Sequence, residues 1–112
     1  MSPSMNPYLL ISDLAEEVRP PTEGMVSHTL FNDENVKVLI LGFAAGHQLA
    51  AHSAPMPVTI QFLQGDAMLT LGEETHAVAG GALIHIQPRL THGIVAKTPV
   101  LILLTMFKAA RG

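Results

Sequence analysis

The chain has 112 residues, no cysteine, six Lys and Arg against nine Asp and Glu, a net charge of −3 and 48% hydrophobic residues. This length supports one hydrophobic core but not two independent domains. The acidic balance and the five aromatic residues, four Phe and one Tyr, argue against nucleic-acid binding. The absence of cysteine excludes disulfide frameworks, thiol nucleophiles and zinc–thiolate sites.

The N-terminus does not resemble a secretory signal, because no basic region precedes an apolar run there. The longest strongly apolar stretch, 100–107, is far shorter than the roughly 20 residues that a membrane helix requires. We therefore expect a cytoplasmic protein whose partners are neither membranes nor nucleic acids.

The sequence divides into an N-terminal extension, residues 1–24, and a single barrel domain, residues 25–112. In the extension, Asp13 and Glu16 have the spacing of a helix capping box. Residues 13–19 are therefore predicted to form one or two helical turns, which a Pro-Pro pair ends. We predict no other helix.

From residue 25 onward, short β-branched or apolar runs alternate with turn-forming residues. The spacing of these runs is typical of an antiparallel sandwich or barrel of eight or nine strands. The runs predicted to be strands are 25–31, 36–43, 58–63, 67–71, 75–78, 82–86, 93–96 and 100–107.

Two of these runs are apolar on both faces, at 38–41 and 101–104. One face belongs in the barrel, and the other requires a second covering layer. A homodimer is the simplest such cover. We expect the N-terminal extension to pack on a neighbouring subunit or to swap with it.

Two segments within residues 36–107 resemble the signature segments of the cupin superfamily. The first begins at Gly46, has a histidine six residues later at His52 and closes at Gly65. The second begins at Gly81 and has a histidine eleven residues later at His92. The resemblance implies an all-β fold: a small, RmlC-like antiparallel jelly-roll barrel with a short N-terminal helical or extended segment. It also implies that the two segments bring their histidines together on a metal at the barrel mouth.

The signature is incomplete in this chain. Two of the four usual metal ligands remain, and only His52 and His92 are carried over as ligands. The departures are Ala54 for the second histidine of the pair, Val58 for the glutamate, Gln87-Pro88-Arg89 for the Pro-x-Gly turn and Ala96 for the asparagine after the last histidine.

A divalent transition metal (Fe, Mn, Ni, Cu or Zn) is a candidate cofactor if a third donor joins this pair, because metal sites usually need three or four donors. The sequence has no Asp or Glu from 38 to 65, and the later acids lie in predicted turns. The remaining candidate donors are His85, His47, Gln61, water or substrate.

The three protein candidates each have a simpler interpretation. His85 alternates with two isoleucines, so it faces away from the core if they line it, as a buried or interface histidine. By the same alternation Gln61 lies on the outer face, and His47 is also readable as a solvated loop residue. Near the mouth, Arg89 either clamps a carboxylate or extends into solvent.

Two hypotheses of function follow. In the first, the barrel mouth binds a small organic molecule and a weakly held metal, with dioxygenase or isomerase chemistry. In the second, the protein is a non-catalytic, metal-free ligand-binding or sensor module. The missing carboxylate argues against a dioxygenase, whereas a metal-free histidine has the pKa range of a base for an isomerase.

Overall fold

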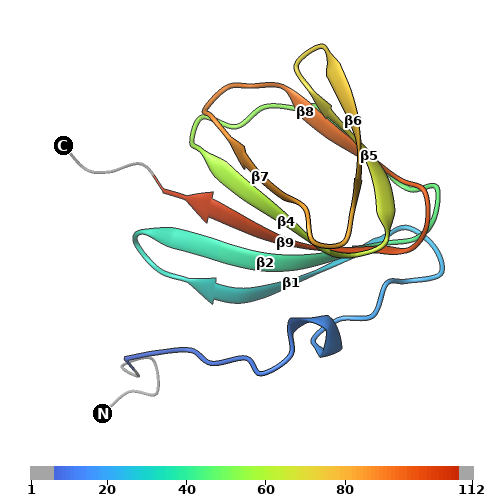
Figure 1. The fold of residues 1–112 in the computed structure, drawn as a ribbon. Helices are drawn as coiled ribbons and strands as arrows, with labels where there is room; N and C mark the ends of the chain where they lie inside the picture. The colour runs from blue at the N-terminus through green and yellow to red at the C-terminus, as the bar shows by residue number, and fades with distance from the viewer. Residues whose placement is uncertain (1–6, 109–112) are drawn as a thin grey trace.

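The computed structural model describes residues 7–108, which form nine antiparallel β-strands and a short 3-10 turn (Figure 1). The strands make a five-stranded sheet in the order β1-β2-β9-β4-β7 and a four-stranded sheet in the order β3-β8-β5-β6. The prediction of an all-β, antiparallel jelly-roll barrel is confirmed. The bounds of the nine strands are β1 (Met25–Asn32), β2 (Val36–Phe43), β3 (Gln48–His52), β4 (Val58–Gln64), β5 (Asp66–Leu71), β6 (Glu74–Ala79), β7 (Leu83–Ile86), β8 (His92–Ala96) and β9 (Val100–Phe107).

The chain passes from one sheet to the other between β2 and β3, β4 and β5, β6 and β7, and β8 and β9. Each of these pairs therefore lies at corresponding positions in the two layers of the barrel. Stacked sheets lie about 10 Å apart, so residues on the inner faces of such a pair face each other across the interior.

All eight predicted strands are present, each with its ends within one residue of the prediction. The ninth, β3, was not predicted as a strand. Its sequence, Gln-Leu-Ala-Ala-His, contains no β-branched residue and no clear alternation of polar and apolar side chains. Pairing with β8 therefore determines its conformation.

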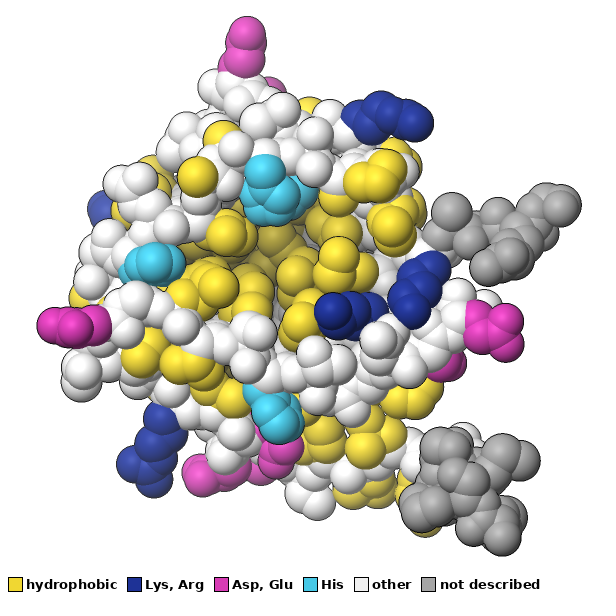
Figure 2. Space-filling view, turned by 180° about the vertical axis from the view of Figure 1, so that it is seen from behind, with side chains coloured by type: hydrophobic (Ala, Val, Ile, Leu, Met, Phe, Trp, Pro, Cys, Tyr) yellow, Lys and Arg dark blue, Asp and Glu magenta, His cyan; other side chains and the backbone are white. Residues whose placement is uncertain are grey.

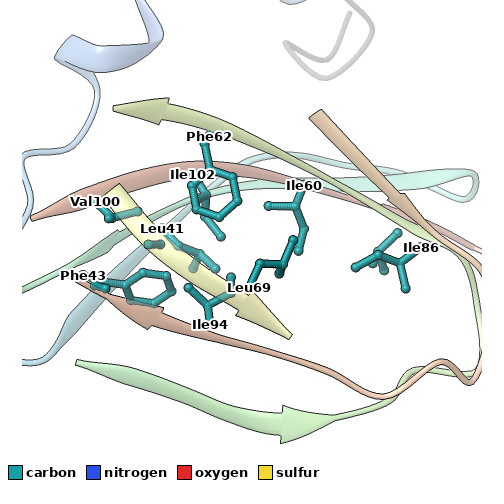
Figure 3. Close-up of a cluster of buried hydrophobic side chains, with 12 residues drawn as sticks. Leu41, Phe43, Ile60, Phe62, Leu69, Ile86, Ile94, Val100 and Ile102 are labelled. Carbon is teal, nitrogen blue, oxygen red and sulfur yellow. The ribbon is translucent and has the colours of Figure 1, made fainter. Parts of the chain in front are cut away.

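The core fills the space between the sheets (Figure 3). β4 supplies Val58, Ile60 and Phe62 to it, as the alternation in its sequence predicts. Leu69 and Ile94 meet them from the opposite sheet. In Figure 3, Ile86 lies apart from the other labelled side chains, toward one end of the barrel.

The N-terminal segment forms one 3-10 turn, η2 (Leu14–Glu16), in place of the longer helix predicted for 13–19. Asp13 caps it by accepting a hydrogen bond from the backbone N–H of Ala15. The capping signal and the lower of the two predicted turn numbers were therefore correct, but the turn ends at Glu16 rather than reaching residue 19, because so short a segment before a Pro-Pro pair does not support an α-helix. Within residues 7–108, no helix is long and apolar enough to cross a membrane.

This segment lies along the outer side of the five-stranded sheet (Figure 1). A Cβ added at Gly42 would lie 3.3 Å from Cα of Pro20, so the proline pair rests directly on β2. Ile40, on the same outer face, is 0% exposed. Around Ile40 and Gly42, the covering layer expected over the outer face of β2 is therefore supplied by the chain's own N-terminal segment.

Candidate functional site

Two histidines lie side by side on the inner face of the four-stranded sheet. His52 ends β3, His92 begins β8, and the two are register partners. Their ring centroids are 4.4 Å apart, with the ring planes tilted by 55°. His92 is 4% exposed, whereas His52 remains exposed to solvent. The structure thus brings together the two residues that the sequence resemblance indicates.

A β-bulge positions His52 for this contact. Leu49 pairs with Ile94 and His52 with His92, so β3 advances three residues while β8 advances two. In a regular strand Ala51 would face His92 and the side chain of His52 would point outward. The extra residue reverses this assignment and aims the imidazole into the barrel.

Gly93 provides the space for this bulge. A Cβ added there would lie 3.2 Å from the backbone nitrogen of Ala51 and 3.1 Å from the carbonyl oxygen of Leu49. Any side chain at this position would press on the backbone of the bulge. The glycine that follows His92 therefore helps to set the position of the other histidine.

Both histidines have their Nδ1 atoms bound to the backbone. Nδ1 of His52 lies 3.0 Å from the carbonyl oxygen of Ala50, and Nδ1 of His92 lies 2.9 Å from that of Leu90. A carbonyl only accepts hydrogen bonds, so each neutral ring carries its proton on Nδ1. Each Nε2 atom consequently presents a lone pair that can accept a hydrogen bond or bind a metal.

The surroundings of the pair are apolar. At the same end of the barrel, the five-stranded sheet contributes Val58 and its register partners Ile86 and Met106. Within the four-stranded sheet itself, Leu71 is the register partner of His92. Figure 2 shows a hollow lined by hydrophobic side chains, with histidine at its upper edge and basic side chains at its lower right. We name this end of the barrel the mouth.

The candidate third donors all lie elsewhere. Nδ1 of His85 is 3.0 Å from Oγ1 of Thr59, and its ring lies 6.2 Å from that of Phe107, on the outer face of β4 and β7. His47 stacks on Phe43 at 5.7 Å, at the opposite end of the barrel. Gln61 is exposed on the outer face of β4, as the alternation predicts. None of the three joins the pair.

No carboxylate completes the pair either. Glu74 shares the inner face of the sheet, but it lies on β6, two strands from His92, and bonds to His76 at 3.3 Å. At 4.7–4.9 Å per strand this is about 10 Å away. Among residues 7–108, no group of three or more His, Cys, Asp or Glu side chains is arranged to hold a metal ion.

Arg89 has an unusual backbone conformation, with φ at +69°. It occupies the position of the glycine in the Pro-x-Gly turn, and its N–H donates to the carbonyl oxygen of Ala54 at 2.7 Å. The turn therefore ties the segment before His92 to the segment after His52. The side chain of Arg89 is exposed.

The sequence analysis did not identify Lys37. It lies on the face of β2 that also carries Leu39, Leu41 and Phe43, and its register partner is Met106. Because β2 faces β3 in the barrel, Lys37 lies across the mouth from His52. Because β2 has apolar residues on both faces, its sequence does not indicate which face, and hence whether Lys37, points into the barrel.

A groove of about 1150 Å³ lies between the N-terminal segment and the outer face of β1, β2 and β9. Its walls include Leu14, Phe31 and Leu103, and its polar groups are the Tyr8 hydroxyl and the side chains of Asn32 and Asp33. It contains no histidine and no cation among its lining residues. The mouth holds the convergent polar groups that a binding site requires, so we take the mouth as the candidate site.

Structural comparison finds several similar proteins. A conserved protein of unknown function from Streptococcus pyogenes is 26% identical, with a TM-score of 0.84 over 93% of this chain and 91% of that one. An RmlC-like cupin from Desulfovibrio desulfuricans is 25% identical, with a TM-score of 0.78 over 89% and 97%. A cupin superfamily protein from Desulfitobacterium hafniense is 18% identical, with a TM-score of 0.81 over 86% and 88%. In sequence alone, no family model and no curated protein matches.

Proposed function

Because this chain is a member of the cupin superfamily, we propose that the mouth of its barrel binds a small organic molecule carrying an O–H or N–H donor. The observation that carries this proposal is the orientation of the histidine pair. Two rings with free Nε2 lone pairs lie side by side at the mouth, one on the buried His92 and one on the exposed His52. Such acceptors gain from a ligand that donates to them.

The burial of His92 supports the same conclusion. Nδ1 of His92 is satisfied by a backbone carbonyl, and among residues 7–108 no buried side-chain nitrogen or oxygen atom lacks a hydrogen-bond partner. Nε2 of His92 is therefore open to the mouth, where a ligand hydroxyl or amide would replace water as its partner. The hydrophobic side chains around it would then cover the apolar part of the ligand.

A divalent transition metal is a second candidate occupant, favoured by the Nδ1 bonds. Histidines that bind metals usually donate their other N–H to a carbonyl or carboxylate, as both do here. The donor set does not fit a resident metal centre, however, because two imidazoles without a carboxylate leave the positive charge uncompensated in apolar surroundings. The residues at the mouth therefore do not support chemistry through a resident metal.

The proposal is tested by titration with 4-methylphenol and with its methyl ether, 4-methylanisole. The two probes have similar shapes, but the ether cannot donate a hydrogen bond. We expect 4-methylphenol to shift the ring resonances of His52 and His92 in NMR spectra, and to bind more tightly than the ether. His92→Phe should remove this preference, whereas His28→Gln, on β1 outside the mouth, should leave it unchanged.

Equal binding of the two probes would contradict the role of the histidine pair as hydrogen-bond acceptors. Shifts confined to Tyr8 and Phe31 would instead move the ligand site to the groove under the N-terminal segment. Either outcome would overturn the proposal.

A further inference from the structure

We infer that the mouth selects small organic anions, with Lys37 binding a carboxylate at the edge opposite the histidine pair. This inference rests on the proposed function and adds the chemical class of the ligand. The ligand would be a small carboxylic acid that carries a hydroxyl or N–H donor at its other end.

The first step is the direction of Lys37. The register between β2 and β9 is continuous from Val36 to Phe43, so strict alternation holds along β2. Leu41 and Phe43 belong to the core cluster. Lys37 therefore has an inner-face position at the mouth, where it is half-buried.

The second step is the charge around it. Among residues 7–108, the one contact within 4.0 Å between a basic side chain and a carboxylate is that of His76 with Glu74, on β6. No carboxylate of these residues therefore lies within 4.0 Å of the ammonium group of Lys37. Its neighbour Lys108 donates instead to Asn32 Oδ1, at 2.7 Å, and to the carbonyl oxygen of Asp33. Lys37 thus retains its donors for a ligand, in a setting less hydrated than the open surface.

The third step is the distance across the mouth. The inner faces of β2 and β3 belong to stacked sheets about 10 Å apart. Lys37 and the histidine pair therefore lie at opposite edges of the mouth, on facing sheets. A molecule that contacts both would lie across the opening of the barrel, with a carboxylate at one end and a donor at the other.

The polarity of the two edges distinguishes this ligand from a simple anion. Neutral histidines with Nε2 lone pairs repel a carboxylate, whereas an ammonium group attracts one. A bound acid would therefore have one orientation, with its carboxylate toward Lys37 and its hydroxyl toward His52 and His92. Such two-ended recognition gives more selectivity than either contact alone.

The experiment compares 4-hydroxyphenylacetate with 4-methylphenol, which has the same phenol but no charge. Binding is followed through the ring resonances of His52 and His92. We expect 4-hydroxyphenylacetate to bind the wild-type protein about tenfold more tightly, as for a hydrogen bond to a charged group. Lys37→Gln should remove this difference, and Lys37→Arg should retain most of it.

Lys97→Gln is the matched control. Lys97 lies in the turn between β8 and β9, at the other end of the barrel, where its N–H donates to the carbonyl oxygen of Asp66. The same loss of one positive charge there should leave the selectivity intact. This comparison separates a local contact from a change in net charge.

The outcomes separate the two proposals. If 4-hydroxyphenylacetate and 4-methylphenol bind equally, or if Lys37→Gln retains the difference, the role of Lys37 is overturned and the mouth remains a binding site for neutral donors. If neither probe shifts His52 and His92, the proposed function fails and this inference fails with it.

Discussion

His52 and His92 lie with their ring centroids 4.4 Å apart, and each donates its Nδ1 proton to the carbonyl oxygen of the residue two positions earlier. The two rings do not bond to each other through these atoms. The backbone fixes the tautomer of each ring, so that both Nε2 atoms are acceptors before any ligand arrives. Preorganisation of this kind lowers the cost of binding.

The first prediction concerns these tautomers. We expect both neutral rings to be Nδ1–H tautomers, because protonation at Nε2 would break a hydrogen bond to the backbone. Long-range 1H–15N NMR spectra report the tautomer directly. His28, exposed on β1, serves as the reference in the same spectra. An Nε2–H tautomer at either His52 or His92 would remove the basis for the proposed function.

The second prediction concerns metal. Because two imidazoles are the only donors that the described chain assembles at the mouth, we expect chelation to leave the melting temperature unchanged. The measurement is elemental analysis of protein purified without a metal-affinity tag, with melting curves before and after a chelator. One equivalent of metal per chain, lost with a fall in melting temperature, would show that a further donor exists.

The third prediction concerns Arg89. A side chain at φ +69° is strained by roughly 1–2 kcal/mol, and glycine relieves this strain. We expect Arg89→Gly to raise the free energy of unfolding by about 1 kcal/mol, measured by denaturant titration. Arg89→Ala removes the same charge but keeps the Cβ atom, so it should give little of this gain. Equal stabilisation by both variants would assign the effect to charge.

The fourth prediction compares two glycines of the cupin-like segments. Gly65 and Gly81 both have positive φ, but a Cβ at Gly65 would overlap the carbonyl oxygen of Pro99, whereas at Gly81 nothing lies within 4 Å. Gly81→Ala should cost roughly 1–2 kcal/mol through strain alone. Gly65→Ala should cost about 2 kcal/mol more, because backbone must move. Denaturation midpoints that reversed this order would contradict the packing of the β4–β5 turn.

The fifth prediction concerns the homodimer. Leu83 is 66% exposed and Phe107 39% exposed, on the outer face that the N-terminal segment leaves uncovered. We propose that a second copy covers this strip, and we expect light scattering after size exclusion to give a dimer that Leu83→Glu dissociates. Val95→Glu places the same charge on the outer face of β8, in the other sheet, and should leave the dimer intact. Dissociation by both variants, or by neither, would place the interface elsewhere.

Local patterns in the sequence were sufficient for most of the fold. Eight strands were predictable because their β-branched and apolar runs end at Gly, Pro, Asn or Asp turns. β3 lacks such a run, and its conformation depends on pairing with β8, which is 40 residues distant in the chain. The N-terminal turn was found by its cap, but its end at Glu16 was not, because the segment before the Pro-Pro pair is too short for an α-helix.

The site was less predictable. The resemblance indicated His52 and His92, but alternation from Leu49 alone would have turned His52 outward, because the bulge has no clear sequence signal. Lys37 was missed for a related reason. β2 is apolar on both faces, so its sequence does not tell which face is internal, and only the N-terminal segment over Ile40 resolves the ambiguity.

Because of the bulge in β3, the histidine pair tolerates the loss of a residue from this strand better than the gain of one. β3 reaches the level of His92 with one residue more than β8 requires. Loss of one residue between Leu49 and His52 would straighten the strand and still deliver a histidine opposite His92. Gain of one residue would require a still larger distortion against Gly93, or would carry the imidazole to the outside of the barrel. Deletions in this short strand are therefore compatible with the pair, and insertions are not.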